Sequence, residues 1–210
     1  MVEGIRPSSP KIITFRPQAI WRIHPARYRP AEFRPGRDGN ARFSPILSAK
    51  DAVIPTLYGA RTVACSMMET ILHDVPTPPT HYILDIERLR DADLRISRLR
   101  CKRALSLVDL SSKGLKRIGL QRRDVIDTPV EEYVRSREWA VRLHTQTQAH
   151  GLLWTSRQDD EAKALVFFGD RIAESAFKVE IDRDRVYEGK HLDALLELAE
   201  HVGISQVIGL

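Results

Sequence analysis

The chain has 210 residues, a length that fits one domain. Charged residues make up 29% and hydrophobic residues 42%, a globular balance that excludes extensive disorder. The net charge of +5 is uneven, because residues 1–42 hold eight arginines and carry all of the excess.

Proline and helical periodicity divide the first part of the chain. Of the 12 prolines, 11 lie at or before Pro79, and each removes a backbone donor. Residues 1–59 are therefore predicted to form loops and short strands. These strands are expected at residues 19–24, 42–46 and 56–58. A helix is predicted over residues 60–73, with Glu69 off its apolar stripe.

The second part of the chain is predicted to contain two more helices and most of the sheet. One helix is expected from Pro129 to about Gln148, and the other over residues 191–201. Strands are expected near residues 81–86, 104–110, 152–155, 164–168, 177–181 and 204–208. Strands outnumber helices and do not alternate with them, so the predicted fold class is α+β in a single domain.

Membrane and secretory signals are not expected in this chain. The longest apolar run is Ala164 to Phe168, far below the roughly 20 residues of a spanning helix. Arginines and prolines interrupt any apolar segment near the N-terminus. The two cysteines, Cys65 and Cys101, form no CxxC pair, which argues against a disulfide scaffold or a zinc site. A cytoplasmic protein is expected.

The common cofactor and metal motifs do not occur. There is no GxGxxG after a strand, no P-loop, no HExxH and no GxSxG, and the seven histidines are not paired at metal-ligand spacing. Metal catalysis and a Rossmann dehydrogenase are therefore not expected.

Four short motifs carry a family resemblance instead. In chain order they are Trp21-Arg22-Ile23, Ala41-Arg42-Phe43-Ser44-Pro45, Leu57-Tyr58-Gly59 and Gly151-Leu152-Leu153-Trp154-Thr155-Ser156-Arg157. Glu69 follows Tyr58 by eleven residues. This order resembles the RES domain, a family named for its arginine, glutamate and serine. The resemblance covers about residues 15–185, which makes residues 1–14 an N-terminal extension and residues 186–210 a C-terminal helix and strand on the same domain.

The resemblance implies a fold, an activity and a partner. RES proteins are toxins of bacterial toxin–antitoxin pairs, with an ADP-ribosyltransferase-like mixed sheet and peripheral helices. They degrade NAD⁺ by hydrolysis or phosphorolysis, so NAD is expected as the substrate and no metal is expected. The expected partner is an Xre-type antitoxin in a hetero-oligomer, through which any nucleic acid contact would be indirect.

The same resemblance assigns roles to five residues. Cleavage of the nicotinamide–ribose bond gives an oxocarbenium-like centre, which the Glu69 carboxylate would stabilise. Arg22 and Arg42 would hold the pyrophosphate, Tyr58 would stack on nicotinamide, and the Ser156 hydroxyl would bind ribose or the amide. The expected catalytic residues are Arg22, Tyr58, Glu69 and Ser156, and the expected binding residues are Arg22, Arg42, Tyr58 and Ser156.

Two alternatives remain open at the level of the sequence. The same fold could transfer ADP-ribose to a macromolecule, because only the acceptor differs from hydrolysis or phosphorolysis. A nucleic-acid-binding module that uses the arginines of residues 1–42 is a different class. Against that module, the aromatic content is 7% and no RNA- or DNA-binding motif is present.

Overall fold

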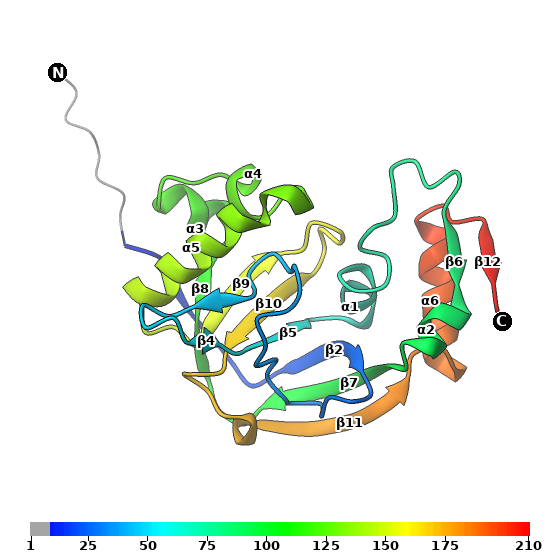
Figure 1. The fold of residues 1–210 in the computed structure, drawn as a ribbon, viewed down its shortest axis with the longest axis horizontal. Helices are drawn as coiled ribbons and strands as arrows, with labels where there is room; N and C mark the ends of the chain where they lie inside the picture. Colours follow the sequence, from blue (N-terminus) through cyan, green and yellow to red (C-terminus); the bar gives the residue numbers. More distant parts are fainter. Residues whose placement is uncertain (1–8) are drawn as a thin grey trace.

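A strongly curved sheet of eight strands forms the centre of the fold, as the computed structural model of residues 9–210 shows (Figure 1). Its strands follow the order β1-β8-β9-β10-β5-β2-β7-β11. In that order their bounds are Ile12–Phe15, Leu105–Asp109, Gly151–Thr155, Lys163–Phe168, Thr56–Ala60, Ala19–Pro25, Leu94–Cys101 and Phe177–Arg185. All neighbours are antiparallel except β8 and β9, so the sheet is mixed.

Helices and two small sheets surround this centre. The helices are α1 (Val63–Met68), α2 (Ile86–Asp91), α3 (Ser112–Arg117), α4 (Arg122–Val125), α5 (Tyr133–Gln146) and α6 (Gly189–His201). The small sheets pair β3 (Ile46–Leu47) with β4 (Val53–Ile54), and β6 (Ile83–Asp85) with β12 (Gln206–Ile208). The expected α+β fold in a single domain is thus confirmed for residues 9–210. In this part of the chain, no helix is long and apolar enough to cross a membrane.

The two faces of the sheet are covered by different apolar clusters. Successive residues of β9 divide between them: Leu152 belongs to the cluster under α5, whereas Leu153 belongs to the cluster on the opposite face. Leu165 and Val166 of β10 divide in the same way. This alternation is the period of two that a strand buried on both faces requires. A third cluster lies under α1, α2 and α6.

The predicted helix over residues 60–73 is wrong in length. Ala60 is the last residue of β5, and α1 begins only after Thr62, whose hydroxyl accepts a hydrogen bond from the Cys65 backbone N–H. The helix ends at Met68, so Glu69 is its C-cap rather than a residue within it. Turns follow over residues 70–74. The short helix therefore places Glu69 at its C-terminal end.

The contact between β2 and β5 joins the two halves of the sheet, which are β1-β8-β9-β10-β5 and β2-β7-β11. The strands share one registered pair, Trp21 with Ala60, beyond which they diverge. Gly59 lies at this contact, and a Cβ built on it would be 2.4 Å from Ile20 Cγ2 and 3.2 Å from the Trp21 carbonyl oxygen. The first distance is far below van der Waals contact, so the close approach depends on a residue without a side chain.

We expect Gly59→Ala to lower the free energy of unfolding by about 1–3 kcal/mol, since the added methyl group overpacks a buried contact. Urea unfolding of the purified variant measures this change. Gly36→Ala is the matched control, because a Cβ there comes no closer than 3.7 Å to its neighbours. Equal stability of Gly59→Ala and Gly36→Ala would show that β2 and β5 can separate without cost.

Candidate functional site

A cavity of about 330 Å³ opens where β2 and β5 diverge. Its walls come from both strands, from α1, from the turn at residues 40–42 and from the start of α5. The polar side chains on these walls include Arg22, Arg42, Tyr58, Glu69, His73 and Tyr133. Four of the five residues expected from the sequence thus share one cavity, and the fifth, Ser156, lies directly behind Glu69.

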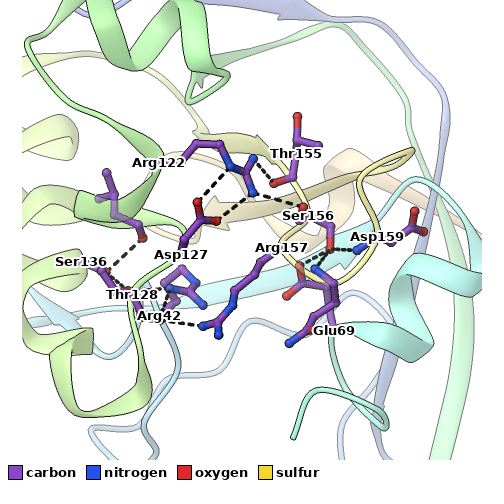
Figure 2. A network of polar contacts seen from close by, with 12 residues as sticks. Arg42, Glu69, Arg122, Asp127, Thr128, Ser136, Thr155, Ser156, Arg157 and Asp159 are labelled. Atoms are coloured by element: carbon purple, nitrogen blue, oxygen red, sulfur yellow. Dashed lines mark hydrogen bonds and ion pairs between the residues drawn. The ribbon is translucent and has the colours of Figure 1, made fainter. Parts of the chain in front are cut away.

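The Glu69 carboxylate is held by the Ser156 hydroxyl. Ser156 Oγ donates to Glu69 Oε1 over 2.6 Å, and Figure 2 shows the two side chains meeting. The same oxygen accepts the backbone N–H groups of Gln158 and Asp159, each at 3.0 Å. Both acceptor positions of the hydroxyl are therefore filled, and its one proton is directed at the carboxylate. Ser156 is fully buried and Glu69 lines the cavity, so this hydrogen bond holds the carboxylate from the protein interior.

Arg122 stabilises the backbone at the end of β9, where Ser156 follows the strand. Arg122 donates to the carbonyl oxygens of Thr155 at 3.1 Å and Ser156 at 3.4 Å, and it pairs with Asp127 at 2.9 Å. These contacts are visible above Ser156 in Figure 2. Arg122 therefore stabilises the backbone next to Ser156, and Asp127 neutralises its charge.

Arg42 has no such carboxylate. Its Nη1 donates to the Thr128 hydroxyl at 2.6 Å and the Thr128 carbonyl at 3.1 Å, and its Nη2 donates to the Tyr133 hydroxyl at 3.2 Å. Its guanidinium also lies over the Tyr133 ring, 4.6 Å from the centroid. Burial lowers the pKa of Arg42, whereas Tyr133 and Glu69 raise it. The side chain is thus a buried cation held by neutral groups.

Arg157 brings a second positive charge to the same place. Its Nη1 donates over 3.0 Å to the carbonyl of Thr128, which also accepts from Arg42. Figure 2 shows the two guanidinium groups side by side on this oxygen. Arg157 acts to lower the pKa of Arg42, as expected for neighbouring like charges. Neither arginine forms an ion pair with a carboxylate of residues 9–210.

Tyr58 orders the turn that carries Arg42. Its hydroxyl accepts the backbone N–H of Phe43 over 2.9 Å, and its ring meets Trp154 edge-on at a centroid distance of 6.4 Å. Burial raises the pKa of Tyr58 to about 12, so its hydroxyl stays protonated at neutral pH. The ring lines the cavity, while the hydroxyl serves the backbone behind it.

Arg22 differs from its expected role in one respect. Its Nη1 donates to the carbonyl oxygens of Pro30 and Glu32, each at 2.8 Å, so part of the guanidinium fastens the following loop. Burial lowers the pKa of Arg22 to about 10.

Two residues further along β2, His24 is buried and its Nε2 lies 2.9 Å from Ser97 Oγ. Burial, and next the charge of Arg22, lower the pKa of His24 to about 4.

Sequence reasoning missed His73 and Tyr133 entirely and gave Arg157 no role. The Tyr133 hydroxyl lies 3.2 Å from His73 Nε2, and both residues line the cavity. His73 falls in the turns after α1, and Tyr133 is the first residue of α5, so no local pattern connects them. Arg157 could have been found, because it directly follows Ser156. In residues 9–210, no cluster of three or more His, Cys, Asp or Glu side chains is arranged to hold a metal ion.

Comparison with known proteins identifies the family. The profile of the RES domain matches residues 19–188, most of the chain. The chain belongs to the RES domain family. No curated protein matches it. Among solved structures, it is similar to one described as the crystal structure of the M. tuberculosis MbcT–MbcA toxin–antitoxin complex. That likeness has a TM-score of 0.61 at 16% identity, over 89% of this chain and 92% of the other.

The RES match includes every residue of the cavity described above. It begins with β2, which carries Arg22, and it ends three residues after β11. Helix α6 and strand β12 both follow the matched region, and they pack on the same third cluster as α1. The expected N-terminal extension of residues 1–14 lies partly outside the described residues.

The His24 environment predicts a pH dependence of stability. Because the folded pKa is about 4 and the unfolded value about 6.5, the unfolded chain binds more protons between these values. Stability should therefore fall as pH is lowered from about 6.5 to 4, by about 3 kcal/mol from this residue. The measurement is urea unfolding across this range for the wild type and for His24→Gln, whose slope should be shallower. An NMR titration that places His24 near 6.5 in the folded protein would contradict this expectation.

Proposed function

We propose that this RES protein cleaves the nicotinamide–ribose bond of NAD⁺ and passes the ribosyl group to water or phosphate. The observation that carries the proposal is the carboxylate of Glu69, fixed by a buried hydroxyl and facing a cavity whose other charged groups are arginines. One negative charge among several positive ones suits a ligand that is cationic at one end and anionic at the other. NAD⁺ has this character, with a pyridinium ring and a diphosphate.

Glu69 would act on the positive charge that develops at the ribose. As the bond to nicotinamide breaks, C1″ of the ribose gains oxocarbenium character, and a nearby carboxylate stabilises it. A carboxylate works best for this purpose if it does not move during the reaction. The Ser156 hydroxyl and the two N–H groups behind it supply that rigidity. Ser156 is therefore proposed as a positioning residue rather than a ribose ligand, because it does not line the cavity.

The diphosphate is assigned to Arg42 and Arg157. Two guanidinium groups that share one carbonyl and lack a carboxylate repel each other until an anion binds between them. Phosphate oxygens accept such paired donors well. Arg157 is exposed and does not itself line the cavity, which is small, so the adenosine end of the dinucleotide would extend beyond the cavity. Arg22 remains available to the ligand only through the nitrogens that the Pro30 and Glu32 carbonyls do not use.

A toxin role and an antitoxin partner complete the proposal. The similar solved structure is described as a toxin in complex with its antitoxin. An enzyme that consumes NAD⁺ needs an inhibitor in its host, and a protein that carries an acidic group into the cavity would meet the same uncompensated arginines. The nucleic-acid-binding alternative finds less support, because Arg22 and Arg42 are buried and point into the protein.

The direct test is incubation of the purified protein with NAD⁺, with and without phosphate, and identification of the products. Nicotinamide and ADP-ribose indicate water as the acceptor, and ADP-ribose 1″-phosphate indicates phosphate. Glu69→Gln keeps the shape but loses the charge, so nicotinamide release should fall about 10²–10³-fold. Glu138→Gln, exposed on α5, is the matched control and should match the wild type. Release by Glu69→Gln within threefold of the wild type would remove Glu69 from the mechanism.

Arg157→Gln tests the diphosphate assignment. We expect the KM for NAD⁺ to rise about tenfold or more, since a charge-assisted hydrogen bond contributes about 1.5–3 kcal/mol, with kcat within threefold. The effect should shrink in high salt because Arg157 is exposed. Arg135→Gln, an exposed arginine of α5, is the control. An unchanged KM in Arg157→Gln would place the diphosphate elsewhere.

A further inference from the structure

A chain of hydrogen bonds leads from the cavity to solvent through Tyr133 and His73. Arg42 Nη2 lies 3.2 Å from the Tyr133 hydroxyl, which lies 3.2 Å from His73 Nε2. His73 Nδ1 in turn lies 2.8 Å from Asp74 Oδ1. Arg42, Tyr133 and His73 line the cavity, whereas the Asp74 side chain is 84% exposed. The chain thus begins beside the ligand site and ends in water.

The donor and acceptor capacities of Arg42, Tyr133, His73 and Asp74 determine the direction of each hydrogen bond in this series. A guanidinium group only donates, so the Tyr133 hydroxyl accepts from Arg42. Its single proton is then directed at His73 Nε2, which must be the unprotonated ring nitrogen. Nδ1 therefore carries the proton, which it donates to Asp74. An imidazole oriented by a carboxylate, with its basic nitrogen toward a hydroxyl, has the arrangement of a general base.

The proposed reaction needs such a base when water is the acceptor, whereas a phosphate dianion already presents an anionic oxygen. When neutral nicotinamide leaves NAD⁺, the positive charge passes to the ribosyl group and then, once the acceptor has attacked, to the acceptor's proton. If Glu69 took that proton, it would lose the charge with which it stabilises the ribosyl cation. One of its oxygens is also engaged by Ser156. A separate proton acceptor allows Glu69 to remain ionised throughout.

We propose that Tyr133, His73 and Asp74 form a proton relay that deprotonates the acceptor water, an inference that rests on the function proposed above. The bond between the water oxygen and C1″ forms as an O–H bond of that water breaks. That proton passes to the Tyr133 oxygen while the Tyr133 proton passes to His73 Nε2. The electron pair of the broken C–N bond leaves with nicotinamide, and the unit of positive charge ends on the His73 ring beside Asp74.

The charged groups around the relay suit this transfer. Burial raises the pKa of Tyr133, so it rests as a hydroxyl. The charges of Arg42 and Arg157 lower the pKa of Tyr133, and those of Glu69 and Asp74 raise it. The two arginines stabilise the negative character that the Tyr133 oxygen gains in transit. Asp74 stabilises the imidazolium and is exposed enough to exchange the proton with water. Gln158 fixes the turn, because its side chain donates to the His73 carbonyl over 2.9 Å.

The test uses His73→Gln in the full chain. A glutamine oxygen can still accept the Tyr133 hydroxyl, but the amide cannot bind the transferred proton. We expect the kcat of nicotinamide release in phosphate-free buffer to fall about 10²-fold or more, with the KM for NAD⁺ within threefold. The wild-type kcat in mixtures of H₂O and D₂O should curve because two protons move together, and this curvature should disappear in His73→Gln. His81→Gln, exposed in the same connection between α1 and β6, should match the wild type.

Other results would overturn the relay. These are a His73→Gln kcat within threefold of the wild type, a rise in KM alone, or a linear wild-type isotope dependence. The ¹⁵N shifts of the neutral His73 ring give a readout without substrate, and a proton on Nε2 would contradict the relay as well. Failure of the wild type to release nicotinamide would instead overturn the proposed function, so the two failures are distinguishable.

Discussion

The close approach of β2 and β5 is the constraint on which the remaining structure depends. The two halves of the sheet meet through one registered pair, and Gly59 permits that contact. If the strands stayed paired along their length, side chains would fill the region that the cavity occupies. If they did not meet at all, Arg22 on β2 and Tyr58 on β5 would belong to separate bodies. A single contact followed by divergence gives both a continuous sheet and a hollow lined from two sides.

Charge is distributed around this hollow in an unusual way for a folded protein. Buried arginines are ordinarily paired with carboxylates, because an isolated buried charge is costly. Here the buried Arg42 is held by a hydroxyl, a carbonyl and an aromatic ring, and the exposed Arg157 donates to the same carbonyl. These groups keep the cations solvated without neutralising them. The positive potential therefore remains directed at the cavity, opposed by Glu69 alone among the residues that line it.

The sequence predicted the fold class and most strands, but not the elements whose patterns are ambiguous. The strands with continuous apolar runs, such as β10, were predicted within one residue. Strand β7 was missed, because three arginines interrupt its apolar positions, and it pairs with β11, which is also rich in charged residues. Helices α3 and α4 were not predicted, since each has fewer than two turns and depends on its caps. The predicted length of α1 was wrong because the apolar periodicity continues beyond both ends of the helix, which runs only from Val63 to Met68.

The candidate site was likewise predicted only in part. The five expected residues, which came from a family resemblance, do converge, although their individual roles are still predictions. The resemblance did not distinguish side chains that face the cavity from those that support it: Ser156 stands behind Glu69, and part of Arg22 serves its own loop. Tyr133 and His73 are 60 residues apart and meet only through the fold. A contact of that kind leaves no local signal in a single sequence.

The carbonyl oxygens that hold the arginines bear on how such a protein can diverge. Arg22 is bound by the main chain of Pro30 and Glu32, and Arg42 and Arg157 by the main chain of Thr128. A peptide carbonyl is present whatever side chain its residue bears. Mutations at these supporting positions therefore leave the main-chain oxygens available, provided that the backbone keeps its path. Related chains could replace most of the residues around the arginines and still present the same charges. In this part of the molecule, the backbone geometry would then be retained even where the sequence differs.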